Sequence, residues 1–184
     1  MIGHPAIGLI EVGSLARGMV VTDQVVKKAE VTLVHSHPIS PGRYLTLFTG
    51  NVAETEESFE QGIATAGEQL VDSMILTGVH DDLSEVLHGN AKKVEVDSLG
   101  IMETWSLASA IQSADRAMKT TDVDLLELRL ASGISGKGYW VVSGKLFEVE
   151  EAIASARDLL APGQLVNTEI IARPHEDMYK FIWS

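Results

Sequence analysis

The sequence predicts a mixed α/β (α+β) fold made of two successive units with the same order of strands and helices. Three observations predict it: the second half of the chain repeats the first, short β-branched runs alternate with amphipathic segments, and the composition is that of a globular protein. Hydrophobic residues make up 45% and charged residues 22% of the 184 residues. These proportions exclude a disordered chain.

The internal repeat is clearest between residues 8–34 and residues 100–126. At an offset of 92 positions these two stretches share nine of 27 residues without a gap. The register then slips by two positions and later by one more, so that matches continue to the end of each half. This pattern indicates a tandem duplication of a unit of about ninety residues. The shared residues are Gly8/Gly100, Glu11/Glu103, Ser14/Ser106, Leu15/Leu107, Ala16/Ala108, Asp23/Asp115, Lys27/Lys119, Val31/Val123 and Leu33/Leu125.

The first unit opens with residues 7–12, which are short, apolar and β-branched and suit a buried strand. Ser14 can cap a following helix, whose apolar residues fall near helical spacing. A strand is expected at 31–35. A turn with two prolines and a glycine at 37–42 then leads into a third strand at 44–49.

The second half of this unit begins at Asn51, which with Glu54 resembles a capping box that opens a helix to about residue 66. A fourth strand at 70–76 and a short helix at 81–87 close the unit. The second unit repeats the order, with a strand at 99–104, a helix at 107–119, strands at 124–131 and 138–143, a helix at 147–160, a strand at 165–172 and a short helix from His175.

The order βαββαβ is that of ferredoxin-like units, in which two helices cover one face of a four-stranded antiparallel sheet. The predicted domains are residues 6–89 and 98–184, joined by a charged linker at 90–97 that lacks an apolar pattern.

Charge and composition exclude several classes of function. The net charge of −12 argues against a protein that binds the phosphate backbone of nucleic acids. The absence of cysteine excludes disulfides, thiolate metal sites and cysteine nucleophiles. No apolar run is long enough for a membrane helix, and the first five residues lack the features of a secretory signal. We therefore expect a cytoplasmic protein without a membrane partner.

Several motifs resemble those of bacterial microcompartment (BMC) shell domains. They are the opening Gly-Leu-Ile-Glu at 8–11 with its copy at 100–103, the helix ending at Asp23–Lys27, and Ile-Ala-Arg-Pro-His at 171–175. Because each unit begins with its own opening strand, the chain resembles the unpermuted tandem class. Within it, the stretches at 102–106 and 133–137 resemble the T-type shell proteins of propanediol-utilisation microcompartments.

The resemblance implies a structural protein without catalytic residues. It implies a homotrimer that forms a pseudohexamer and tiles with other shell proteins into the shell within the cytoplasm, with encapsulated enzymes as further partners. It places a central pore at the loop after the second strand, and contacts between neighbouring tiles at Lys27, Lys119 and Arg173. The pore residues implied are His37, Pro38, Ile39, Ser40, Pro41 and Gly42, with Ser135 and Gly136 in the second unit's loop.

One position departs from these relatives. They carry a cysteine in the pore loop that holds a 4Fe–4S cluster, whereas this chain has Ser40. A serine hydroxyl stays protonated near neutral pH and is a poor ligand for a cluster that prefers thiolates. We therefore expect no cofactor and a polar passage for small metabolites or their anions, with His37 and Arg43 near it.

Other motifs favour ordinary structural roles. His80 and His175 are expected to cap or pack the closing helices, while His35 and His37 share a strand face that would suit a metal but have no carboxylate nearby. Residues 133–138 fail the phosphate-loop pattern and predict a tight turn. Glu54–Glu57 form a solvated helix start. The alternative to a shell protein is a tandem ferredoxin-like regulatory protein that binds a small molecule.

Overall fold

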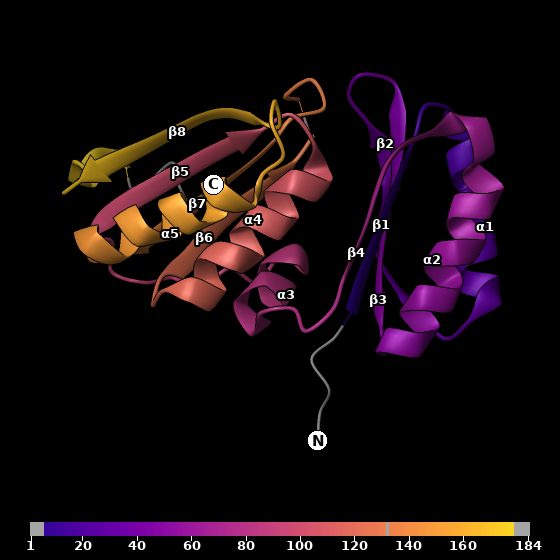
Figure 1. The fold of residues 1–184 in the computed structure, drawn as a ribbon, viewed down its shortest axis with the longest axis horizontal. Coiled ribbons are helices and arrows are strands. Elements are labelled where there is room, and N and C mark those ends of the chain that lie inside the picture. Colours follow the sequence, from indigo (N-terminus) through magenta and orange to yellow (C-terminus); the bar gives the residue numbers. More distant parts are fainter. Residues whose placement is uncertain (1–5, 132, 179–184) are drawn as a thin grey trace. The chain divides into compact units, whose positions relative to one another are not determined.

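The computed structural model describes residues 6–131 and 133–178. The chain divides into two compact units between Val79 and His80 (Figure 1). Each unit contains one four-stranded antiparallel sheet, in the order β2-β3-β1-β4 in the first and β6-β7-β5-β8 in the second. Since β1, β3, β2 and β4 correspond in turn to β5, β7, β6 and β8, the two sheets have the same topology. The predicted pair of α/β units is confirmed.

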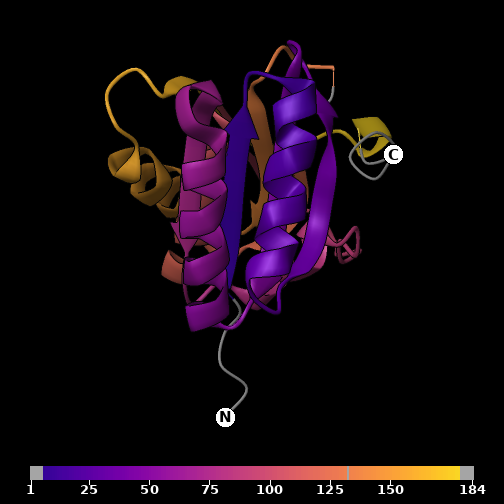
Figure 2. The ribbon, with the colours of Figure 1, turned by 90° about the vertical axis from the view of Figure 1, so that its right-hand side faces the viewer.

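The first unit follows the predicted order closely. Helices α1 and α2 lie side by side on one face of its sheet, as Figure 2 shows. A single 3₁₀ turn, Gly67–Gln69, leads from α2 into β4. The elements are β1 (Ala6–Val12), α1 (Leu15–Lys28), β2 (Thr32–Ile39), β3 (Arg43–Gly50), α2 (Val52–Ala66) and β4 (Leu70–Leu76).

Both helices of this unit begin where the sequence predicts. The backbone N–H of Arg17 donates to the Ser14 hydroxyl at 3.3 Å, and the backbone N–H of Glu54 donates to Oδ1 of Asn51 at 3.0 Å. Each bond satisfies one of the N–H groups that the first turn of a helix leaves without an intrahelical partner.

The second unit contains the same elements, and α4 and α5 cover one face of its sheet (Figure 1). Helix α3 follows β4 in the chain but packs against β6, so it belongs to the second compact unit. The elements are α3 (Asp81–Leu87), β5 (Ser98–Thr104), α4 (Leu107–Thr120), β6 (Asp124–Leu130), β7 (Gly138–Gly144), α5 (Leu146–Leu159), β8 (Leu165–Ala172) and a 3₁₀ turn at Glu176–Met178.

The turn after the second strand is shorter than the sequence predicts. Residues 37–39 were expected to belong to it, but they continue β2 and pair with Leu45, Tyr44 and Arg43 of β3. The strand tolerates Pro38 because β2 lies at the edge of the sheet, where one side of the strand has no ladder to complete. The prediction of a turn from His37 is therefore wrong, and the connection consists of Ser40, Pro41 and Gly42.

The two units pack their first helix on the sheet in different ways. In the first unit Gly18 of α1 lies so close to Tyr44 of β3 that an added Cβ would be 2.3 Å from the Cβ of Tyr44. In the second unit the corresponding positions are Ala110 and Gly138, and a Cβ added to Gly138 would lie 2.6 Å from the Cβ of Ala110. In the first unit, therefore, the glycine is on the helix and a large residue, Tyr44, is on the strand. In the second unit the helix carries Ala110 and the strand carries Gly138, so both residues are small.

Candidate functional site

The connection between β2 and β3 is a short tip. Ser40 is half-buried, whereas Pro41 and Gly42 are exposed, and the Ser40–Pro41 peptide bond is cis. Gly42 has a φ of 73°, a conformation that a residue with a Cβ rarely adopts. The tip therefore presents a hydroxyl, a proline ring and backbone groups to its surroundings.

The other residues expected at this site lie in β2. His37 is half-buried and Pro38 is exposed, but the side chain of Ile39 turns into the protein, since only 6% of this residue is exposed. The rings of His35 and His37 contact each other edge to face, with centroids 5.5 Å apart. Among residues 6–131 and 133–178, no group of three side chains is placed to hold a metal ion.

Hydroxyl groups connect the tip strands to helix α1. The Thr22 hydroxyl lies 2.8 Å from that of Thr46 and 3.1 Å from that of Ser36, which in turn lies 3.0 Å from the Tyr44 hydroxyl. This cluster was missed by sequence reasoning, although the alternation of Tyr44 and Thr46 on one strand is a signal that could have found it. Because each hydroxyl is partnered, the cluster holds β2 and β3 in place beside the tip.

Arg43, at the other end of the tip, forms an ion pair with Glu11 of β1. Its Nη1 donates to Oε1 of Glu11 at 2.7 Å, and the Glu11 side chain is 1% exposed. Burial raises the pKa of Glu11, an effect that the Arg43 charge opposes and the charge of Asp72 adds to. The guanidinium of Arg43 is therefore committed to a carboxylate within its own sheet.

The second unit repeats this pair with different residues. Lys137, which precedes β7, donates to Glu103 of β5. The carboxylates that recur in the two halves of the sequence, Glu11 and Glu103, thus each hold the residue that ends the turn between the second and third strands. In both units the recurring carboxylate therefore has a role in the fold.

The corresponding turn of the second unit lies between β6 and β7. Ser135 is exposed and has a φ of 56°, whereas Gly136 is buried and has a φ of 82°. The backbone N–H of Lys137 donates to the carbonyl of Ile134 at 3.2 Å. These residues form a tight turn, as predicted in preference to a phosphate loop.

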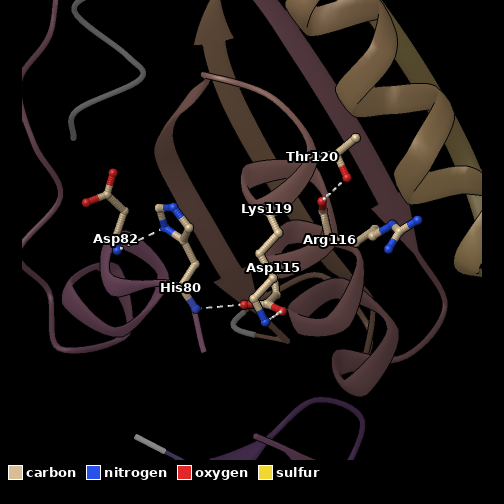
Figure 3. Close-up of polar contacts among 6 residues, drawn as sticks. All are labelled: His80, Asp82, Asp115, Arg116, Lys119 and Thr120. Atoms are coloured by element: carbon tan, nitrogen blue, oxygen red, sulfur yellow. Dashed lines mark hydrogen bonds and ion pairs between the residues drawn. The ribbon is translucent and has the colours of Figure 1, made fainter. Parts of the chain in front are cut away.

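The histidines that follow the fourth strands cap the next turn of helix. Nδ1 of His80 accepts from the backbone N–H of Asp82 at 3.3 Å, and Nδ1 of His175 accepts from that of Asp177 at 3.2 Å. The backbone N–H of His80 also donates to Asp115 of α4 at 2.8 Å (Figure 3). The predicted capping role is confirmed.

The three residues expected at tile edges differ in their surroundings. Nζ of Lys27 lies 2.7 Å from exposed Asp23, whose pKa is lowered mainly by this hydrogen bond. Nζ of Lys119 lies 2.5 Å from Asp115, which is buried. Arg173 is exposed, has a φ of 54°, and lines a surface hollow with Glu95, Val96, Asp97 and Pro174.

The fold, a tandem of two such α/β units that each carry a short tip between the second and third strands, matches that of BMC-domain proteins. The family model of the BMC domain matches residues 6–79 and, a second time, residues 98–174. The chain belongs to this family, as a tandem-domain shell protein, and members of this kind are structural rather than enzymatic. The family assignment decides against a regulatory protein.

Individual relatives agree with the assignment. The chain is 38% identical to the bacterial microcompartment shell protein PduT of Citrobacter freundii, over 95% of this chain and 96% of that protein. The crystal structure of a microcompartments protein from Desulfitobacterium hafniense DCB superposes with a TM-score of 0.91 at 36% identity, covering 96% of this chain and 98% of that one. The fused permuted hexameric shell protein MSM0275 of the RMM microcompartment gives 0.63 at 25% identity, covering 84% and 82%.

None of the helices in the described part of the chain is both long and apolar enough to cross a membrane.

Proposed function

We propose that three copies of this chain form a ring of six BMC domains that serves as one tile of a microcompartment shell. The observation that carries the proposal is the repetition of the whole domain, including its tip and its capped closing segment, within one chain of a shell-protein family. Two units of the same topology can alternate around a three-fold axis in the way that identical domains surround a six-fold axis. Other shell proteins, and enzymes enclosed by the shell, are the expected partners.

The opening at the centre of this ring would be lined by Ser40, Pro41 and Gly42. Pro41 and Gly42 are exposed and Ser40 is half-buried, whereas Ile39 is buried in the unit. Arg43 contributes little free positive charge because Glu11 lies against its guanidinium. The passage would therefore select small polar metabolites by size and by hydrogen bonding to hydroxyl and backbone groups.

The residues at the tip do not fit an iron–sulfur cluster. Ser40 offers a hydroxyl that remains protonated, and its neighbours Ile39, Pro41 and Gly42 have no side chain that binds iron. The sequence contains no cysteine that another segment could bring to the tip. The cluster that the resemblance implies for relatives is therefore not expected in this protein.

Sedimentation equilibrium tests the ring. The full chain of 19.9 kDa is expected to behave as a trimer over a range of concentrations near neutral pH. Electron microscopy of concentrated samples is expected to show sheets, tubes or hexagonal arrays. A protein that stays monomeric at the highest concentration, without arrays, would refute the proposal.

A further inference from the structure

The segments that follow β4 and β8 share one motif, and we call residues 80–87 the first closing segment and residues 174–178 the second. In each, a histidine ring accepts a hydrogen bond from the backbone N–H two residues later, at 3.3 Å for His80 and 3.2 Å for His175. The two histidines are also equivalent in the internal repeat of the sequence. The segments are therefore two copies of the same structural element.

The first closing segment is docked on helix α4 and strand β6. The backbone N–H of His80 donates to Oδ1 of Asp115 at 2.8 Å, while Nζ of Lys119 lies 2.5 Å from the other carboxylate oxygen (Figure 3). Helix α3 packs against β6, where Leu125 lines a hollow with residues of α3 and is only 2% exposed. Asp115 and Leu125 are thus the receptor for this segment.

The matching receptor in the first unit, formed by Asp23 and Leu33, is uncovered. The side chain of Asp23 is 48% exposed, compared with 5% for Asp115. Leu33 is 38% exposed, compared with 2% for Leu125. Lys27 and Gln24 both donate to Oδ2 of Asp23, and within residues 6–131 and 133–178 its Oδ1 accepts no hydrogen bond.

Residues 175–178 of the second closing segment are exposed as well. The side chain of His175 is 73% exposed, and its backbone N–H donates no hydrogen bond to any residue that the structure describes. Met178 is 39% exposed, although Leu83, its equivalent in the first closing segment, is fully buried. The second closing segment and the Asp23–Leu33 receptor are therefore both exposed, although their equivalents, the first closing segment and the Asp115–Leu125 receptor, are bound to each other.

We propose that the second closing segment of one chain docks on the Asp23–Leu33 receptor of a second copy. The backbone N–H of His175 donates to Oδ1 of Asp23, as that of His80 does to Asp115, and Met178 covers Leu33. A second copy is the occupant because the chain itself contains the same segment bound to the same kind of receptor. The contact is heterologous, and when it is repeated about a three-fold axis the third chain meets the first. This contact rests on the proposed trimer, and it specifies which residues join one chain of the trimer to the next.

Engineered disulfides test the contact directly, because the chain has no cysteine of its own. The matched control is His80→Cys with Asp115→Cys, because the backbone N of His80 lies 2.8 Å from Oδ1 of Asp115 and a disulfide needs Cα atoms about 4.4–6.8 Å apart. On oxidation it should form a bond within one chain and leave the mass on a denaturing gel unchanged. Asp23→Cys with His175→Cys should instead give covalent dimers and trimers, whereas each single variant should give none of the trimer.

A second measurement does not depend on oxidation. Asp23→Ala should raise the protein concentration at which the trimer dissociates by about tenfold or more, since it removes a hydrogen bond to a charged acceptor in every contact. Asp158→Ala, which removes an exposed carboxylate of α5, should leave that concentration unchanged.

The outcomes separate this contact from the trimer itself. If the parent is trimeric but Asp23→Ala dissociates as the parent does and only the control pair crosslinks, the proposed contact is wrong and the trimer stands. An intrachain bond between positions 23 and 175 would also overturn it, because the receptor would then be filled by its own chain. A parent that does not form trimers would overturn both proposals.

Discussion

The close approach of α1 to its sheet makes Gly18→Ala the most informative single change in the core. Replacing glycine by alanine within a helix ordinarily stabilises it by about 1 kcal/mol. At this position the new methyl group would lie 2.3 Å from both Cβ and Cγ of Tyr44. Carbon atoms in contact are ordinarily about 3.5–4.0 Å apart, so helix or strand must shift by more than an ångström.

The expected magnitude follows from these two opposing effects. Overpacking costs about 1–3 kcal/mol. The upper end applies here, because the backbone fixes the position of the Tyr44 Cβ, which no change of rotamer can move away. Subtracting the gain in helix propensity leaves a net loss of about 2 kcal/mol. For a chain of this length, that loss should lower Tm by about 4–8 °C.

Thermal unfolding followed by circular dichroism at one fixed protein concentration measures the effect. A decisive control repeats Gly18→Ala in a Tyr44→Gly background, which copies the Ala110–Gly138 pair of the second unit. There the methyl group has room, so the same change should raise Tm. An unchanged or raised Tm in the parent background, or an equal loss in both backgrounds, would refute the reasoning.

Three further predictions concern assembly, the tip and pH. Replacing Lys27 and Lys119 by alanine should abolish extended arrays in electron micrographs but leave the trimer, and unchanged arrays would make these lysines ordinary solvated surface. Ser40→Cys should create converging thiols that accept an iron–sulfur cluster on anaerobic reconstitution, whereas the parent should stay colourless. Iron and sulfide analysis checks both proteins. A stoichiometric cluster in the parent would contradict the inference that Ser40 prevents cluster binding. Because the pKa of Glu11 is raised in the folded protein, the folded state binds more protons than the unfolded state above the ordinary value of 4.5. The Tm of Glu11→Gln relative to the parent should therefore rise as pH increases through that window, and a difference independent of pH would contradict the assignment.

Much of the fold could be predicted because its signals are local. The caps at Ser14 and Asn51 depend on a side chain and a backbone N–H three residues away, so the sequence places them correctly. The period of apolar residues similarly reports which segments are strands and which are helices. Because of the internal repeat, each strand and helix is predicted twice, once in each half of the sequence. The motifs at the ends of each half carry the resemblance to BMC shell domains, which the family assignment confirms.

The candidate site was predicted less completely. Its position after the second strand was expected from the resemblance, but the length of the strand was not, since proline and glycine suggested a turn from His37 onward. Pairing with β3 extends β2 through Pro38 to Ile39 because the strand lies at the sheet edge. No local pattern reports that position, which depends on the order of strands that are distant in sequence.

The sequence by itself determined the duplication, the order of elements, the helix caps and the absence of thiol ligands, all of which depend on residue type and short spacing. Only the tertiary structure decided that Arg43 is neutralised by Glu11, that hydroxyls from α1, β2 and β3 meet, and that α3 packs on β6. It also decided that Asp115 is buried while the equivalent Asp23 is exposed. Equivalent residues in a repeat share their chemistry, but their burial depends on what distant parts of the chain pack against them, and that information is not local.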